Sequence, residues 1–332
     1  MIINQRMFDH YGIDTTKNMA LEKKCPRPFD TVLIDKQGSC YACECQAWLP
    51  QSIGNLNSSA LVDIIKSPMS TQIQDSIADG SYRYCNNNQC MYLMDMSRVP
   101  WAESTPIKAL KEIRLAIDDS CNLSCPSCRS KTIFIKGGKM LSMRLHLIDK
   151  IIKYINDHNS PLNIHIGSDG DPFASLVYRY FMRNVPEKSN LSYTFQTNGL
   201  LVKQMYHRVK HIFSNLKSLN ISIDGATKNT YEKLRRGGQW NKIIENLKFI
   251  KDIKNKKNFK LNLHMVVQKD NWKEMPLMLD IASQYNVDTV YFNPIQDWNV
   301  LKNFAEIKAP EELIEFKNIL NKIKKNPITN AW

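Results

Sequence analysis

Three cysteines, Cys121, Cys125 and Cys128, have the types and the spacing that could do chemistry in this chain. They follow a run of alternating apolar residues at 113–119, so all three belong to one loop. Thiolates at C-x3-C-x2-C spacing can hold three irons of a 4Fe–4S cluster and leave the fourth iron without a protein ligand. Such an iron can bind a substrate or a cofactor as well as store an electron. We therefore expect the chemistry to start in this loop.

The remaining cysteines form a second group, which consists of Cys25, Cys40, Cys43, Cys45, Cys85 and Cys90. Clustered cysteines in a chain without a secretion signal are more typical of metal ligation than of disulfides. One interpretation is a zinc ribbon made from the Cys40–Cys43 and Cys85–Cys90 pairs. The other is a second iron–sulfur cluster.

The segment around this second group predicts a small α+β domain over residues 1–105. Asp35–Gly38 is typical of a hairpin turn between two short strands. Residues 58–67 and 70–78 have the patterns of two short helices. This region is too short to bury a large core, so a bound metal group would supply part of its stability.

In the rest of the chain, residues 106–332, strand-like and helix-like segments alternate. We expect strands near 112–118, 162–168, 191–197, 218–224, 260–268 and 289–295. We expect helices near 140–157, 173–184, 200–214, 227–252, 272–285 and 310–325. Serial βα units predict an α/β fold with a parallel sheet and right-handed crossovers. Six strands are too few for a closed eight-stranded barrel, so the pattern favours a partial, TIM-like (β/α)6 barrel.

The predicted strands alternate apolar and polar residues, whereas a parallel strand buried on both faces is continuously apolar. The apolar residues should face the helices, so the polar ones should line the barrel interior. The candidates for substrate binding or catalysis there are Arg114, His165, Asp224, Asn262 and His264.

Composition limits the function classes. Hydrophobic residues make up 43% of the chain, but no apolar run is long enough for a membrane helix, and residues 1–6 show no secretory signal. We therefore expect a cytoplasmic protein. The formal charge of +13 suggests an acidic partner such as a phosphorylated substrate. Basic and aromatic residues are not interleaved in a stripe, so we expect no specific nucleic-acid binding.

The barrel segment resembles the radical S-adenosylmethionine (SAM) enzymes over about residues 110–300. The resemblance rests on the three-cysteine loop, on Gly167–Pro172 in place of the family's Gly-Gly-Glu-Pro motif, and on Ser222–Gly238. It implies a radical SAM type of barrel and a 4Fe–4S cluster whose open iron binds SAM. The residues that it implies for SAM binding are Ser168, Asp169, Asp171, Asn198, Ser222, Arg235 and Arg236. Ser127 replaces the family's aromatic residue, so adenine stacking must come from another side chain.

The N-terminal segment resembles the auxiliary-cluster modules of the SPASM/twitch branch of that family, here placed before the barrel. The resemblance rests on Cys25-x12-Gly38-x4-Cys43 and on the late pair Cys85 and Cys90. It implies an auxiliary 4Fe–4S cluster on those four cysteines, with Cys40 and Cys45 as alternatives. Asp224, His165 and His264 are then the catalytic candidates.

Three functions remain open at this point. The first is a radical SAM oxidoreductase that oxidises or cross-links a peptide or protein. The second is an enzyme that modifies a polar small molecule, such as an amino sugar or a nucleotide-linked metabolite. The third is a non-catalytic iron–sulfur carrier or scaffold. Either enzyme would need an electron donor such as flavodoxin or ferredoxin.

Overall fold

The computed structural model describes residues 25–94, 110–296 and 304–331 and divides the chain into two compact units. Unit 1 contains residues 1–118, 138–168 and 184–191, and unit 2 contains residues 119–137, 169–183 and 192–332. The domain boundary predicted near residue 105 lies outside the described residues.

The strands of unit 1 are β1 (Thr31–Asp35), β2 (Ser39–Tyr41), β3 (Ser52–Asn55), β4 (Glu112–Ala116) and β5 (Leu162–Ile166). They follow the order β3-β2-β1-β4-β5, antiparallel from β3 to β1 and parallel from β1 to β5. The predicted hairpin between β1 and β2 is confirmed, because Gly38 N donates to Asp35 O at 3.0 Å. Gly38 has φ +80°, and a Cβ there would lie 2.7 Å from Asn57 Nδ2, so the turn requires glycine.

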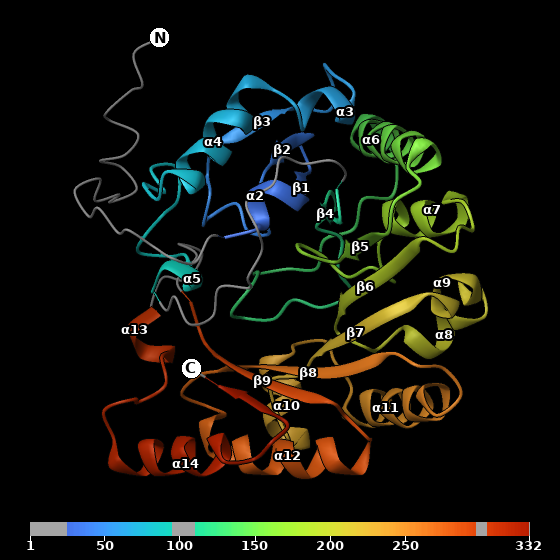
Figure 1. Cartoon of the computed structure of the whole chain (residues 1–332). Helices are drawn as coiled ribbons and strands as arrows, with labels where there is room; N and C mark the ends of the chain where they lie inside the picture. The colour runs from blue at the N-terminus through green and yellow to red at the C-terminus, as the bar shows by residue number, and fades with distance from the viewer. Residues whose placement is uncertain (1–24, 95–109, 297–303, 332) are drawn as a thin grey trace. The chain divides into compact units, whose positions relative to one another are not determined.

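The helices of unit 1 are α2 (Arg27–Asp30), α3 (Leu61–Ile64), α4 (Pro68–Ala78), α5 (Met91–Met94) and α6 (Gly138–Asp157). The predicted helix over 58–67 is reduced to the single turn of α3. Its N-cap, Ala60, offers no side-chain hydrogen bond, whereas the Ser67 hydroxyl accepts from Ser70 N and starts α4. The long helix predicted over 140–157 is confirmed as α6, which lies beside α3 (Figure 1).

The strands of unit 2 are β6 (Leu191–Thr197), β7 (Leu216–Ser222), β8 (Lys260–Val267), β9 (Thr289–Pro294) and β10 (Thr329–Ala331). They lie in chain order from β6 to β10, and every pair is parallel. The register pairs Leu219 with Leu261 and Asn220 with Asn262. Apolar residues therefore share one face of this sheet and polar residues share the other, as the alternation predicts.

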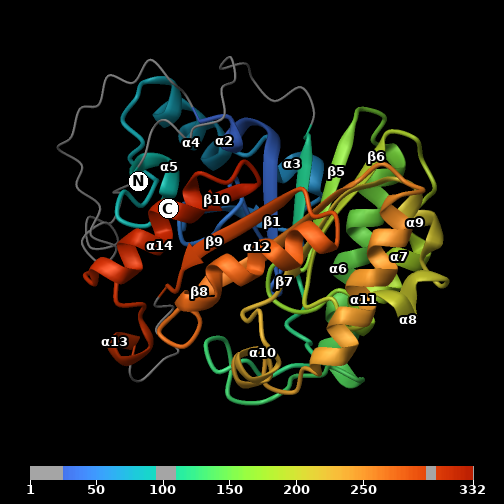
Figure 2. The ribbon, with the colours of Figure 1, turned by 90° about the horizontal axis from the view of Figure 1, so that it is seen from below.

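The helices of unit 2 are α7 (Leu176–Asn184), α8 (Val202–Tyr206), α9 (Lys210–Ser214), α10 (Lys228–Leu234), α11 (Trp240–Lys254), α12 (Met275–Gln284), α13 (Phe304–Ile307) and α14 (Ile314–Lys324), with a 3-10 turn, η2 (Trp272–Glu274), before α12. In Figure 2, α12 and α14 lie along β9 and β10. Among the described residues, no helix is both long enough and apolar enough to cross a membrane.

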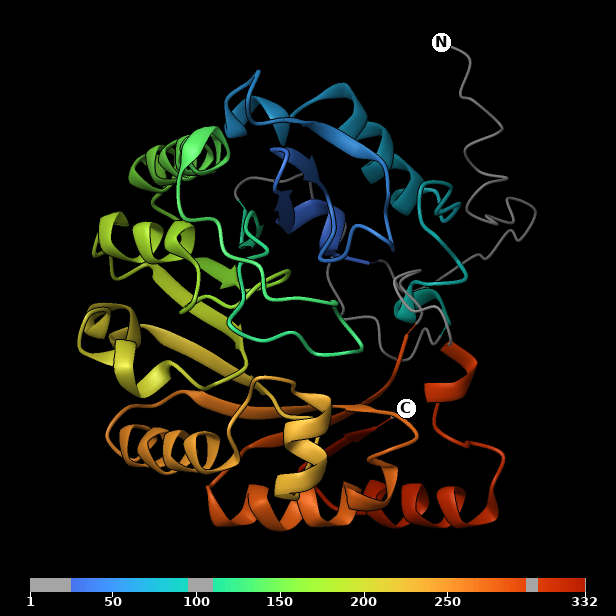
Figure 3. The ribbon, with the colours of Figure 1, turned by 180° about the vertical axis from the view of Figure 1, so that it is seen from behind.

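Two helices that the sequence predicted as continuous are interrupted. The one expected at 200–214 is divided into α8 and α9, and the one expected at 227–252 into α10 and α11, whose axes differ in direction (Figure 3). The second break has a clear cause, since Gly237 has φ +92° and a Cβ on Gly238 would lie 2.8 Å from Arg235 O. The glycine pair thus separates α10, which ends at Leu234, from α11, and Arg235 and Arg236 lie between the end of α10 and these glycines.

Candidate active site and a second cysteine site

The three-cysteine loop belongs to unit 2 and is held by backbone hydrogen bonds at both ends of the motif. Cys121 N donates to Ile133 O at 2.8 Å, and Cys128 N donates to Cys125 O at 2.9 Å. The second bond closes a tight turn over C-x2-C. Cys125 is buried, Cys121 is half-buried and Cys128 is exposed. Burial raises the pKa of Cys121 to about 11 and also raises that of Cys125.

Arg129 ties this loop to the one that follows β5. Its Nη1 donates to Asp119 O at 2.6 Å and its Nη2 to Asp169 O at 2.7 Å, while Nε donates to Cys128 Sγ at 3.3 Å. Asp169 therefore contributes a carbonyl oxygen here. Sequence reasoning did not identify Arg129, although its place directly after the third cysteine is a signal for a cation beside a thiolate.

The end of α10 supplies two arginines with different partners. Arg236 Nε donates to Ser124 Oγ at 3.1 Å, and Ser124 N donates back to Arg236 O at 3.0 Å. Arg235 is half-buried, with Nε 2.8 Å from Asp224 Oδ2 and Nη1 3.9 Å from Cys125 Sγ. Burial lowers the pKa of Arg235, but Asp224 and Cys125 outweigh burial and raise it above its usual value. Arg235 therefore stays charged beside Cys125.

Asp171 is fully buried, and its carboxylate accepts four hydrogen bonds. Oδ2 accepts from Thr197 Oγ1 at 2.6 Å and from Asn198 N at 2.9 Å, while Oδ1 accepts from Phe173 N at 3.0 Å and from Ala174 N at 3.1 Å. Burial raises the pKa of Asp171, and these bonds oppose that rise. Four bonds use the lone pairs of one carboxylate, so Asp171 positions the neighbouring loop.

Asn198 is the residue that Asp171 holds in place. Its Nδ2 lies 2.9 Å from Asn122 Oδ1 and 3.8 Å from Cys121 Sγ. The structure thus brings Asn198, Arg235 and Arg236 to the three-cysteine loop, as the sequence resemblance implied. It leaves the Asp169 side chain exposed, and Ser168, which belongs to unit 1, is exposed as well.

On the polar face of the unit 2 sheet, several polar side chains donate hydrogen bonds to one another in pairs. Asn262 Nδ2 donates to Asn220 Oδ1 at 2.8 Å, and Gln196 Nε2 donates to Ser222 Oγ at 2.6 Å. His264 differs, because its ring stacks on Tyr291 at 4.5 Å and its buried Nε2 has no hydrogen-bond partner among the described residues. Burial, with a smaller contribution from Arg235, lowers the pKa of His264 to about 4.

In unit 1, His165 adjoins a half-buried network of charged side chains. Its Nε2 lies 3.5 Å from Arg114 Nη2, and Arg114 Nη1 pairs with Glu112 Oε1 at 2.6 Å. Arg114 Nη1 also lies 3.5 Å from Glu44 Oε2, which is 3.1 Å from Arg27 Nη2. Sequence reasoning missed Glu44 and Arg27, whose positions beside Cys43 and Cys25 are the available signal.

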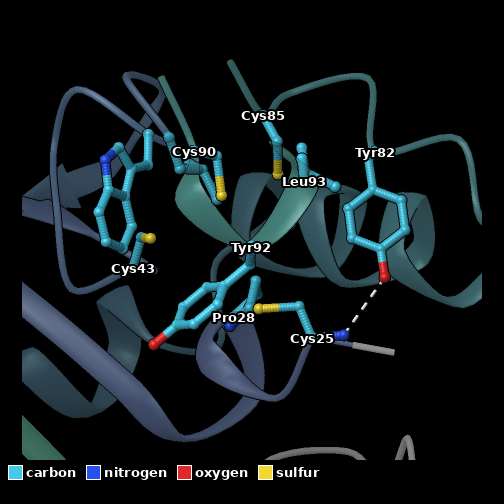
Figure 4. A pocket seen from close by; sticks show the side chains of 10 residues that line it. Cys25, Pro28, Cys43, Tyr82, Cys85, Cys90, Tyr92 and Leu93 are labelled. Atoms are coloured by element: carbon cyan, nitrogen blue, oxygen red, sulfur yellow. Dashed lines mark hydrogen bonds between the residues drawn. The ribbon is translucent and has the colours of Figure 1, made fainter. Parts of the chain in front are cut away.

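A second cysteine site lies within unit 1 and is shown in Figure 4. One pocket is lined by Cys25, Cys43, Cys85 and Cys90, the four cysteines that the resemblance implied as ligands. Its other walls are apolar or aromatic and consist of Pro28, Trp48, Leu49, Tyr82, Tyr92 and Leu93. Cys40 and Cys45 do not line it, and the Cys40 thiol donates instead to Gly38 O at 3.7 Å.

The environment of these four thiols bears on which group they could hold. Burial raises the pKa of Cys25 to about 12 and raises the pKa values of the other three as well. A bound cationic metal group would offset this by binding thiolates. Among the described residues, no three His, Cys, Asp or Glu side chains converge as ligands of one metal ion. A tetrahedral zinc site needs all four sulfurs within about 2.3 Å of one ion, whereas an iron–sulfur cluster distributes them over several irons.

The residues that form the three-cysteine site also match a known protein family. The family model of the radical SAM superfamily matches residues 117–282, half of the chain, including all three loop cysteines, Asp171, Asn198 and Arg235. The chain belongs to the radical SAM superfamily. Members of this superfamily are enzymes that use a 4Fe–4S cluster and SAM, and three thiols with a neighbouring amide and guanidinium fit such a pair of groups.

Curated relatives are similar to the chain at low identity. The GTP 3',8-cyclase of Alkaliphilus metalliredigens is 27% identical over 143 residues, 42% of this chain and 43% of that protein. The GTP 3',8-cyclase of Lactiplantibacillus plantarum is 24% identical over 219 residues, 64% of this chain and 61% of that protein. The chain thus spans about two fifths to three fifths of the length of these relatives.

Solved radical SAM structures also match. SuiB of Streptococcus suis bound to S-adenosylmethionine has a TM-score of 0.46 and 13% identity, and the match covers 67% of this chain and 49% of SuiB. The structure titled native anSMEcpe with bound AdoMet and Cp18Cys peptide has a TM-score of 0.45 and 18% identity, covering 66% and 62% of the two chains.

Proposed function

We propose that this radical SAM superfamily member cleaves SAM reductively and removes a hydrogen atom from a substrate in the partial barrel. The supporting observation is the grouping of Cys121, Cys125 and Cys128 with Asn198 and Arg235 in unit 2. If these cysteines hold a 4Fe–4S cluster, that group would supply the electron for the reductive cleavage of SAM.

The chain's own residues would then bind and align SAM. Arg129 and Arg236 hold the cysteine loop through its backbone and Ser124. Asp171 fixes Asn198, whose amide is available for SAM hydroxyl or carboxylate groups next to Cys121. Arg235 keeps a positive charge beside Cys125, where it favours an anionic SAM carboxylate. Tight alignment of this kind is the protein's main contribution to radical chemistry.

We further propose that Cys25, Cys43, Cys85 and Cys90 hold an auxiliary 4Fe–4S cluster, as in the SPASM/twitch branch. Their common pocket and the burial that raises their pKa values support this. Such a cluster would accept the electron left on a substrate radical, so the net reaction would be an oxidation or a cross-link. The zinc ribbon is less well supported, because Cys40 lies outside this pocket.

For the substrate, we propose a peptide or protein. The support is the resemblance to the auxiliary-cluster branch, many of whose members modify peptides. His264, with an unpartnered Nε2 and a lowered pKa, would meet the substrate as a neutral ring, and His165 and Asp224 remain further catalytic candidates.

A second candidate is a polar small molecule, in particular a nucleotide-linked metabolite. It is favoured by the curated relatives named GTP 3',8-cyclase and by the formal charge of +13. Either reaction would take its electrons from a donor such as flavodoxin or ferredoxin in the cytoplasm.

Anaerobic reconstitution with iron and sulfide tests this proposal. The wild-type chain should bind about eight irons and release 5'-deoxyadenosine when SAM and dithionite are added. Cys125→Ala should lose SAM cleavage, whereas Cys85→Ala should lose about four irons and keep it. Zinc in place of the second set of irons would contradict the auxiliary cluster, and an absence of 5'-deoxyadenosine would favour the non-catalytic carrier. Adding candidate peptides or GTP and following deuterium transfer into 5'-deoxyadenosine would separate the two substrate classes.

A further inference from the structure

Unit 1 contains a large cleft that the proposed function does not use. It lies between residues 58–66 and the second half of α6, and its volume is about 660 Å³. This volume is within the range of about 300–1,000 Å³ that small-molecule sites occupy. No cysteine and no residue assigned above to SAM lines the cleft.

The cleft is positively charged. Lys66, Lys150 and Lys153 line it, and Asp157 is the single acidic residue in the lining. Lys150 Nζ donates to Leu56 O at 2.6 Å and to Asn57 O at 3.1 Å, which fixes the turn before the cleft to α6. Among the described residues, Lys66 and Lys153 have no ion pair and are exposed. Two ammonium groups are therefore available for an anion.

The remaining wall is flat and apolar. Tyr154 stacks on His158 with ring centroids 5.3 Å apart and an interplanar angle of 29°. Val62 is 43% exposed and Ile65 is buried, so the part of the cleft formed by residues 60–65 is aliphatic, and Ser58 and Ser59 adjoin it. A planar ring can pack against such surfaces while its charged substituent reaches the lysines.

We propose that this cleft binds a small molecule that joins a phosphate group to a planar ring, the class to which nucleotides belong. Lys66 and Lys153 take the phosphate, because an ammonium group binds phosphate as a point charge. The ring packs against Tyr154 and Val62. This site goes beyond the proposed function, since its residues lie on α3, on α6 and in the segments that adjoin them, and not on the barrel strands.

AMP is a suitable probe, and the reconstituted holoenzyme with saturating SAM is the protein to titrate, so that the SAM site is already filled. Binding is measured by calorimetry and by saturation-transfer NMR. Adenosine, which lacks the phosphate, and ribose 5-phosphate, which lacks the planar ring, should each bind at least about tenfold more weakly than AMP. Raising the salt concentration should weaken AMP binding, because the lysines are exposed.

Variants locate the site. The double substitution Lys66→Glu and Lys153→Glu should weaken AMP binding by about tenfold or more. Lys256→Glu makes the same kind of charge change at an exposed lysine of unit 2 and should leave the affinity unchanged. If the double variant does not fold, Val62→Glu is the alternative test variant, because Val62 lines the cleft at an exposed position.

The proposal is overturned if wild-type protein shows no AMP binding up to about 10 mM, or if AMP binds with equal affinity to a folded double variant. It is also overturned if adenosine binds as well as AMP. None of these measurements depends on SAM cleavage, so the cleft and the proposed function can fail separately.

Discussion

Asp171 Oδ2 accepts a 2.9 Å hydrogen bond from the backbone N–H of Asn198, so the loop after β5 fixes the loop after β6. The same oxygen accepts from Thr197 Oγ1 at 2.6 Å. Asn198 in turn reaches Asn122 and Cys121. The buried Asp171 carboxylate therefore positions the Asn198 side-chain amide at the cysteine loop.

Asp171→Asn should disturb this arrangement, because an amide presents an NH2 group to two of the four donors that now point at the carboxylate. We expect a loss of about 1–3 kcal/mol in the free energy of unfolding and a SAM dissociation constant raised by about tenfold. Thermal unfolding and SAM titration of the reconstituted protein measure the two effects. Asp252→Asn, an exposed position on α11, is the matched control. Unchanged SAM affinity in a folded Asp171 variant would refute the positioning role.

Arg235→Met should leave the Asp224 carboxylate buried without its cation. Removing one partner of a buried ion pair costs about 3–5 kcal/mol, so the denaturation midpoint should fall clearly. Adding Asp224→Asn should restore part of the loss, because the amide carries no charge and its oxygen can still accept from Val266 N. A double-mutant cycle in guanidinium chloride measures the coupling. Additive effects of the two substitutions would show that the 2.8 Å pair is not coupled.

The fold could be predicted from sequence wherever local patterns decide it. The alternation in Ile113–Leu115 or Leu261–Leu263 gives both the strand and its buried face, and it places Asn220 and Asn262 on the polar face. Long-range choices could not be predicted in this way. No local signal shows that β1 pairs in parallel with β4, because such pairing depends on packing between segments far apart in the chain.

In the candidate site, too, some residues could be predicted from the sequence and others could not. The family resemblance implied Cys25, Cys43, Cys85 and Cys90 as ligands, and these four cysteines line one pocket in the structure. The supporting residues do not follow from spacing. Arg129 acts through the carbonyl groups of Asp119 and Asp169, and Glu44 acts through Arg27, and such contacts depend on three-dimensional placement that residue type does not encode.

Glu44→Gln should destabilise the wall next to the second cysteine site. Glu44 accepts from Tyr92 Oη at 2.8 Å and pairs with Arg27 and Arg114, and all three charged side chains are largely buried. Glutamine keeps the acceptor but removes the charge, so we expect a loss of about 1–3 kcal/mol. Glu245→Gln, whose partner Lys203 is exposed, should not change the denaturation midpoint measurably. Equal midpoints for the two variants would argue against a buried network around Glu44.

Stability should depend on pH through His264. Its pKa is lowered from 6.5 to about 4 by burial, with a smaller contribution from Arg235. The folded chain thus binds this proton more weakly than the unfolded chain. The contribution of His264 to stability is therefore complete above pH 6.5 and is lost as the pH falls from 6.5 toward 4. Between pH 7 and pH 5 the wild-type chain should lose about 2 kcal/mol through this group.

Denaturation curves at pH 7 and pH 5 test this expectation for the wild type and for His264→Gln. The variant has no imidazole to protonate, so it should lose less stability than the wild type over the same pH interval. His146→Gln replaces an exposed histidine and should follow the wild type. If His264→Gln and the wild type lose the same stability, the His264 ring must already be open to protonation in the folded chain. A neutral, unpartnered Nε2 beside Tyr291 would then no longer be available for the substrate.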